Sequence, residues 1–198
     1  MGDARPRVRG PKRAGGDGEP QVFCADEQDA EPVDVARWRA LALATLLHEG
    51  VRGLCELSLF FIDEETMADL NSEHMGKTGP TDVLSFPMDG ADAVMEVQGP
   101  GALTRGPSRP HPDMDDVPTL LGDVLVCPAV ARRQCAAHAG TYDDEIALLV
   151  VHGVLHVLGL DHDTDANTAD MRARELAVLG EHHWRGPAPA GFRQDHPE

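Results

Sequence analysis

The chain has 198 residues, 41% of them hydrophobic, and a formal net charge of −17. This size and composition predict one globular domain with tails, and no apolar run approaches the length that a membrane span needs. The acidity argues against a chain that binds nucleic acid by overall charge. The four cysteines form no CxxC pair and the N-terminus lacks a hydrophobic signal core, so we expect buried thiols in a reduced, cytoplasmic protein.

The N-terminal part predicts an extension followed by a strand, a helix and a second strand. Residues 1–20 are rich in Gly, Pro and Arg, carry a net charge of +2 and are predicted to be disordered, which leaves −19 on the remainder. A short strand is predicted at 21–24. The pattern at 33–49 is helical, with Gly50 as its stop. The apolar run at 55–62 predicts a buried strand.

The next part predicts a helix, a loop, a strand and a long insertion. Asp63 is a good N-cap for the helix, because its carboxylate can accept hydrogen bonds from the first helical amides. Residues 75–81 are rich in turn formers, and 82–87 reads as a strand ended by proline. Residues 89–118 are rich in Gly, Pro and Asp without an apolar period, which predicts a flexible insertion or a lid.

The C-terminal part predicts one more strand and three helices. The strand is expected at 120–127, and a helix opens at Pro128 and runs to Gly140. Thr141 caps a helix that is apolar nearly all round and is therefore expected to be central and buried. A last helix is expected at 166–179, before a disordered tail at 183–198. The whole predicts a single-domain mixed α/β (α+β) fold, with a small mixed sheet packed with about five helices.

Three histidines make the central helix a predicted metal-bearing helix. His152, His156 and His162 follow the spacing H-x3-H-x5-H, and residues four apart lie on one helix face. Gly159 is placed to end the helix and turn His162 back to the same point. Three neutral imidazoles suit a borderline divalent metal and leave a fourth position open, as in catalytic zinc sites. A closed structural site would need a fourth ligand, normally cysteine, and no cysteine lies nearby in the sequence.

The histidine string resembles the zinc helix of the metzincin proteases, with one difference. Those enzymes need a glutamate directly after the first histidine as general base, and this chain has Gly153 there. A metal-dependent peptidase is therefore disfavoured, and it stays as an alternative that would need a different base.

The fuller string HGVLHVLGLDH resembles the signature of the YbeY family of bacterial metalloendoribonucleases. Other blocks of the chain resemble that family in the same order: Leu70-Asn71, Gly76-Lys77, 80–87 and 121–124. The resemblance covers about residues 21–182, which it implies are a metalloendoribonuclease domain with one zinc ion on His152, His156 and His162. It further implies single-strand-specific RNA cleavage in 3′-end maturation of 16S rRNA and in ribosome quality control. The implied partners are single-stranded rRNA, the small ribosomal subunit and its assembly factors, with no DNA and no membrane.

Two positions depart from the family pattern. Many relatives carry an arginine just before the Gly-Lys pair, where this chain has Met75. Another basic residue would then have to stabilise the phosphate charge. Lys77 is the candidate catalytic residue for this role, and Arg132 and Arg172 are the alternatives. The signature usually has tyrosine where this chain has Leu160, a change that we expect to be tolerated.

Several points of mechanism stay open at this stage. Zinc can lower the pKa of a coordinated water to about 7 and can polarise a phosphoryl oxygen, and both roles suit phosphodiester cleavage by water or by the RNA 2′-hydroxyl. Asp161 could orient a ligand or accept a proton, or it could cap the turn. The alternative to an enzyme is a non-catalytic ribosome-assembly factor with a structural metal.

Overall fold

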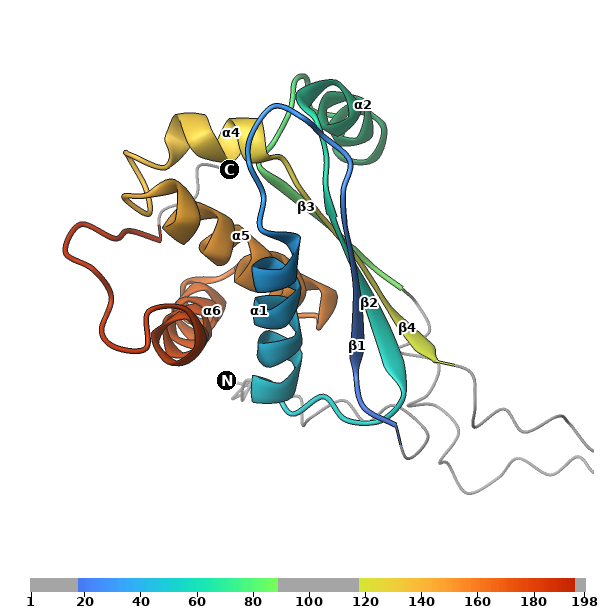
Figure 1. Cartoon of the computed structure of the whole chain (residues 1–198), viewed down its shortest axis with the longest axis vertical. Helices are drawn as coiled ribbons and strands as arrows, with labels where there is room; N and C mark the ends of the chain where they lie inside the picture. The colour runs from blue at the N-terminus through green and yellow to red at the C-terminus, as the bar shows by residue number, and fades with distance from the viewer. Residues whose placement is uncertain (1–17, 89–117, 195–198) are drawn as a thin grey trace, which may run out of the picture.

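The computed structural model of the protein describes residues 18–88 and 118–194, and these form one mixed sheet with helices packed on it (Figure 1). The strands are β1 (Gln21–Asp26), β2 (Cys55–Phe61), β3 (Val83–Pro87) and β4 (Thr119–Val126). In the sheet they lie in the order β1–β2–β4–β3, with β1, β2 and β4 parallel and β3 antiparallel to β4. The predicted extension at 1–20 and insertion at 89–118 fall almost entirely outside the described residues.

The helices lie mostly on one face of this sheet. They are α1 (Val35–His48), α2 (Glu64–Met75), α4 (Pro128–Gln134), α5 (Tyr142–Val157) and α6 (Asp165–Val178), and a π-helical turn η2 (Leu179–His183) follows α6. Figure 1 shows α1 and α5 against the sheet, α6 farther from it, and α2 near one end of the strands. The predicted single-domain mixed fold with a small sheet and about five helices is confirmed for the described part of the chain.

Local sequence explains where two of these helices begin. The Asp63 carboxylate accepts a hydrogen bond from the Thr66 amide at 2.8 Å, and the Thr141 hydroxyl accepts one from the Asp144 amide at 3.1 Å. Each contact satisfies an amide that has no partner within the helix. Both predicted N-caps are therefore confirmed.

Helix α5 is the centre of the core. Residues 144–155 are all buried, and the apolar ones among them belong to one cluster with the inward side chains of β2 and β4. Strand β2 alternates strictly between buried and half-buried residues, because its inward side chains face this cluster. A helix enclosed in this way holds its side chains in fixed positions, which suits a ligand site.

The prediction of a helix from Pro128 to Gly140 is wrong in its second half, since α4 ends at Gln134. The reason is a buried carboxylate on α5. Glu145 accepts hydrogen bonds from the Gln134 side chain at 2.8 Å and from the Ala139 amide at 3.2 Å. After Gln134 the Ala137 and His138 amides donate to carbonyls only three residues back, so the chain forms tight turns that these contacts with Glu145 hold against α5.

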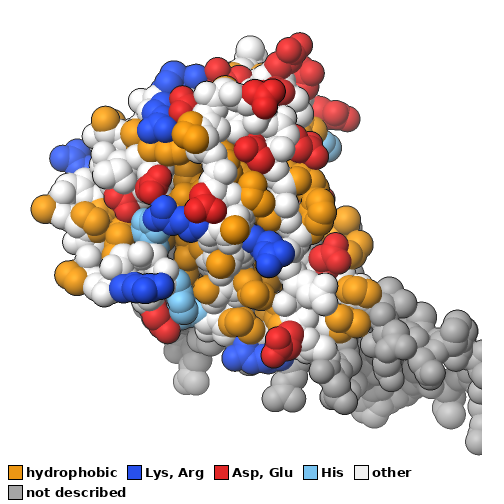
Figure 2. All heavy atoms as spheres, viewed as in Figure 1, with side chains coloured by type: hydrophobic (Ala, Val, Ile, Leu, Met, Phe, Trp, Pro, Cys, Tyr) orange, Lys and Arg blue, Asp and Glu red, His pale blue; other side chains and the backbone are white. Residues whose placement is uncertain are grey.

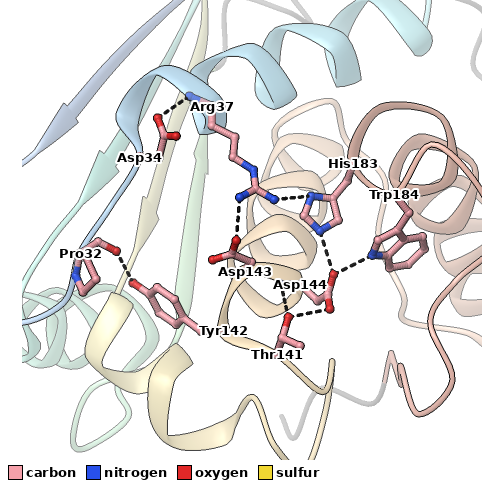
Figure 3. A network of polar contacts seen from close by, with 9 residues as sticks. All are labelled: Pro32, Asp34, Arg37, Thr141, Tyr142, Asp143, Asp144, His183 and Trp184. Carbon is pink, nitrogen blue, oxygen red and sulfur yellow. Dashed lines mark hydrogen bonds and ion pairs between the residues drawn. The ribbon is translucent and has the colours of Figure 1, made fainter.

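A polar network ties the C-terminal turn to α1 and α5 (Figure 3). One Asp144 oxygen accepts hydrogen bonds from His183 Nε2 at 2.8 Å and from Trp184 Nε1 at 2.7 Å. Arg37 on α1 forms an ion pair with Asp143 at 2.7 Å and lies 3.4 Å from His183 Nδ1. The network therefore joins three segments that are far apart in sequence.

The charge on Asp144 is stabilised by this network. Burial by itself would raise the pKa of its carboxyl group, but hydrogen bonds from Thr141, Trp184 and His183 outweigh it and lower the pKa below its ordinary value of 3.8. Trp184 and Phe192 also pack against the core, with their ring centroids 4.7 Å apart. This packing of residues 183–194 was not predicted from the sequence, where the segment reads as a disordered tail.

The other face of the sheet is partly covered by α2. Phe23 and Leu120 on that face are 53% and 50% exposed, whereas Phe60 and Leu84 pack with the α2 residue Met67. Figure 2 shows acidic side chains gathered over α2, while acidic and basic side chains are mixed over the rest of the visible surface. An anionic ligand would therefore be repelled by α2 more than by its surroundings.

All four cysteines are free thiols, and the prediction that they are buried is confirmed for three of them. Cys55, Cys127 and Cys135 are buried and Cys24 is half-buried, and burial raises the pKa of the Cys24 thiol to about 11. None of the helices in residues 18–88 and 118–194 combines the length and apolar character needed to cross a bilayer.

Candidate metal centre

The structure brings the three predicted histidine ligands together. His152 and His156 lie one turn apart on α5, and His162 follows the end of that helix; one ring nitrogen from each lies within 4.8 Å of the others. His152 Nε2 and His156 Nε2 are 3.0 Å apart. Two nitrogens bound to one metal at about 2.0–2.1 Å and a tetrahedral angle would be about 3.3 Å apart. The donor set therefore fits one divalent transition-metal ion.

Backbone geometry at the end of α5 brings His162 to the site. Gly159 has φ 83°, a left-handed conformation that glycine adopts without strain, and the Leu160 amide donates to the Leu155 carbonyl at 3.0 Å. The Asp161 carboxylate then accepts a hydrogen bond from the His162 amide at 2.7 Å. Asp161 was predicted to orient a ligand, to accept a proton or to cap the turn, and this contact favours capping of the turn.

Glu175 on α6 orients the first ligand, and the sequence pattern gave no sign of it. Its Oε1 lies 2.8 Å from His152 Nδ1 and its side chain is 2% exposed, while its Oε2 accepts a hydrogen bond from Gln194 Nε2 at 2.8 Å. An ionised carboxylate can only accept, so we assign the proton of His152 to Nδ1, which leaves the Nε2 lone pair for a metal. Carboxylate–histidine–metal chains of this kind are a common feature of metal sites.

His156 is neutral at physiological pH. Burial, with the neighbouring His152 and His162, lowers its pKa from 6.5 to about 4. A metal needs the neutral imidazole, so no proton has to be displaced from this ring near pH 7.

His152, His156 and His162 line a cavity of about 810 Å³, and residues of the sheet and of α2 line it as well. Lys77 and Arg172 line it, and so do Met75 and Asn71. Met75 is the last residue of α2 and is not part of the predicted loop, because Gly76 ends the helix in a left-handed conformation. Lys77 is exposed and makes no ion pair within the described residues. Two basic side chains thus share a cavity with the predicted metal ligands.

The structure places Arg132 and Arg133 elsewhere. Arg132 pairs with Glu31 at 2.9 Å and lies over the Tyr142 ring at 3.6 Å, and Arg133 pairs with Glu64. Neither lines the cavity. Of the three basic residues suggested to replace the family arginine, Lys77 and Arg172 are near the histidines and Arg132 is not.

Close packing explains why residue 153 is glycine. A Cβ atom added at Gly153 would lie 2.5 Å from Val124 Cγ1 and 3.3 Å from Ser85 Oγ, since α5 lies directly on β3 and β4 here. A glutamate at this position would have to displace side chains of β3 and β4. The packing of the helix, like the residue type, therefore disfavours the metzincin general base at this position.

Comparisons with known proteins identify the family that this chain is similar to. The model of the family described as "Endoribonuclease YbeY" matches residues 23–183. A relative of that name from Frankia casuarinae is 44% identical over 83% of this chain and 75% of its own length. One from Thermobifida fusca is 45% identical over 78% of this chain and 88% of its own length. The relative from Mycobacterium tuberculosis is 36% identical over 86% of this chain and 84% of its own. A solution structure from Thermotoga maritima aligns with a TM-score of 0.46 at 20% identity, covering 84% of this chain and 91% of that one.

Proposed function

This chain belongs to the endoribonuclease YbeY family, and we propose that it cleaves single-stranded ribosomal RNA in 3′-end maturation of 16S rRNA and in ribosome quality control. As a member of the family it is a metal-dependent endoribonuclease. The observation that carries the proposal is the three-histidine centre, with its oriented first ligand, in a cavity large enough for part of a nucleotide chain.

Zinc is the metal that we propose for the centre. Three imidazoles with a carboxylate behind one of them are typical of zinc sites with an open fourth position. When bound, the ion would lower the pKa of a coordinated water and polarise a phosphoryl oxygen. Glu175 holds the His152 ring in one tautomer, and the burial of His156 keeps that ring neutral.

Lys77 and Arg172 are the proposed phosphate-binding residues. Both line the cavity of the histidines, and their positive charges would attract a phosphodiester and stabilise negative charge that develops on it. Lys77 follows Gly76 directly, so the turn at the end of α2 fixes its position relative to the cavity. The pair would supply the charge that relatives obtain from the arginine replaced here by Met75.

The proposed partners follow from the substrate. A chain with a net charge of −17 binds RNA poorly by overall attraction, so contacts within the cavity and within the small ribosomal subunit, with its assembly factors, would position the RNA. The cytoplasm is the proposed location because ribosomal RNA is the proposed substrate.

The test is a substrate panel on the purified, zinc-loaded chain. We expect cleavage of single-stranded RNA, with little cleavage of duplex RNA and none of casein, and loss of cleavage in His156→Ala. A 2′,3′-cyclic phosphate on the products would identify the RNA 2′-hydroxyl as the attacking group, and a 5′-phosphate with a free 3′-hydroxyl would identify water. Hydrolysis of casein would favour the peptidase, and zinc binding without cleavage of any substrate would favour the non-catalytic assembly factor.

A further inference from the structure

A second group of metal-binding side chains lies on the surface, away from the cavity of the three histidines. His48 is the last residue of α1, and Glu181 and His182 belong to the π-helical turn η2. One donor atom from each of the three lies within 4.8 Å of the others. The side chains of His48, Glu181 and His182 are 28%, 63% and 30% exposed. They do not line the cavity described above, so a metal could reach them independently of it.

The distances in this surface cluster suit a shared cation better than direct pairing. His48 Nδ1 lies 3.5 Å from Glu181 Oε2, and His182 Nε2 lies 3.7 Å from Glu181 Oε1. Both separations are too long for a good hydrogen bond, and exposed ion pairs contribute little stability. The two distances end on different oxygens of Glu181, and each is close to the distance of about 3.3 Å that separates two donors on one tetrahedral metal with bonds of about 2.0–2.1 Å.

The fold anchors the backbone of the turn that carries two of the three side chains. The Trp184 amide donates to the Leu179 carbonyl at 2.9 Å, which is the i→i+5 bond of a π-turn. His183 and Trp184 then point inward and donate to Asp144 (Figure 3). Glu181 and His182 precede this anchored pair on the same turn. Extra residues in a π-turn are frequent at functional sites, because they redirect side chains that a regular helix would place elsewhere.

His48 lies on the other side of the cluster, on a helix whose backbone is anchored in the core. It closes α1, whose residue Leu46 is fully buried, and its ring lies edge-on to the His182 ring at 6.1 Å and 89°. An edge-on pair of imidazoles leaves both rings able to direct a nitrogen at a point between them. The donors therefore need only small side-chain rotations to bind.

We propose that His48, Glu181 and His182 form a second, surface site for a divalent transition-metal ion such as Zn²⁺. Two imidazoles and a carboxylate are ligands that zinc, nickel and copper accept, whereas Ca²⁺ and Mg²⁺ prefer oxygen ligands throughout. Water completes the coordination on the exposed side. The bound ion links the end of α1 to the turn that carries the C-terminal segment, so it stabilises the folded state.

The test is a calorimetric titration of the metal-free full chain with zinc chloride at pH 7.5. We expect one tight equivalent at His152, His156 and His162 and one weaker equivalent at the surface cluster. His48→Gln and His182→Gln should each weaken the second equivalent at least tenfold and leave the tight one unchanged. The matched control is His74→Gln, which removes another exposed histidine, on α2, and should leave both equivalents unchanged.

Three results would overturn the assignment. The first is a single equivalent in the unmodified chain. The second is a weaker equivalent that keeps its affinity in either His48→Gln or His182→Gln, because the ion would then lie elsewhere. The third is loss of the tight equivalent in these variants, because the surface cluster would then not be independent of the buried site. Failure of any RNA cleavage assay would not bear on this proposal, since both equivalents are measured by binding alone.

Discussion

Replacing Glu175 with glutamine should weaken zinc binding without removing a ligand. The Glu175 carboxylate is buried between His152 Nδ1 and Gln194 Nε2, at 2.8 Å from each. Glutamine keeps the size of the side chain and loses the charge. Its amide would also have to present one N–H group either to His152 or to Gln194, both of which donate in the native arrangement.

The expected loss is between tenfold and a hundredfold in zinc affinity. Residues that orient a metal ligand typically contribute about this much, which corresponds to about 1.4–2.7 kcal/mol. Two features place Glu175 inside that range. It is 2% exposed, so solvent does not screen its charge, and it contacts one of the three ligands, so two keep their geometry.

The assay is competition for zinc between the chain and a chromophoric chelator at pH 7.5. Glu145→Gln is the matched control, because Glu145 is a fully buried carboxylate on α5. It contacts Gln134 and the Ala139 amide, and it contacts none of the three histidines predicted to bind the metal. It should lower thermal stability and leave the zinc dissociation constant within about twofold. A Glu175→Gln dissociation constant within twofold of the unmodified chain, or an equal shift in both variants, would refute the orienting role.

Four further predictions concern the metal, the core, the network and the substrate. His156→Ala should abolish the tight zinc equivalent, which elemental analysis would measure. It should also cancel the rise in melting temperature that zinc produces, since the ion binds only the folded state. Full zinc content in the variant would contradict the prediction. Gly153→Ala should lower the melting temperature, because overpacking costs about 1–3 kcal/mol and exceeds the gain of about 1 kcal/mol in helix propensity; an unchanged or raised value would show that the sheet can move. Asp144→Asn should destabilise the fold by about 1–3 kcal/mol at pH 7. The folded-state pKa of Asp144 lies below 3.8, so its stabilising charge is present above that pH and is lost as the pH falls through the lowered value. The difference in free energy of unfolding between the unmodified chain and Asp144→Asn should therefore shrink in acid, and a difference independent of pH would rule this out. Deleting residues 1–20 should leave the salt dependence of RNA binding nearly unchanged, whereas Lys77→Ala should clearly reduce cleavage; the opposite pattern would place the substrate on the extension.

The sequence by itself determined the parts of this protein that depend on neighbouring residues. The spacing of His152 and His156 puts both rings on one face because backbone hydrogen bonds fix the helical turn, and Gly159 ends that helix because it tolerates the left-handed conformation. The caps Asp63 and Thr141 each accept a hydrogen bond from the amide three residues further along the chain. Such local rules predicted the strands, most helix starts and the clustering of His152, His156 and His162.

Only the tertiary structure decided which distant side chains meet at the site. Glu175 reaches His152 because α6 packs on α5, and Arg132 is drawn to Glu31, away from the cavity that Lys77 and Arg172 line. The early end of the predicted helix after Pro128 has the same origin, in a carboxylate of another helix. These contacts depend on how buried surfaces fit together across the chain, and no short-range pattern of residue types encodes that fit.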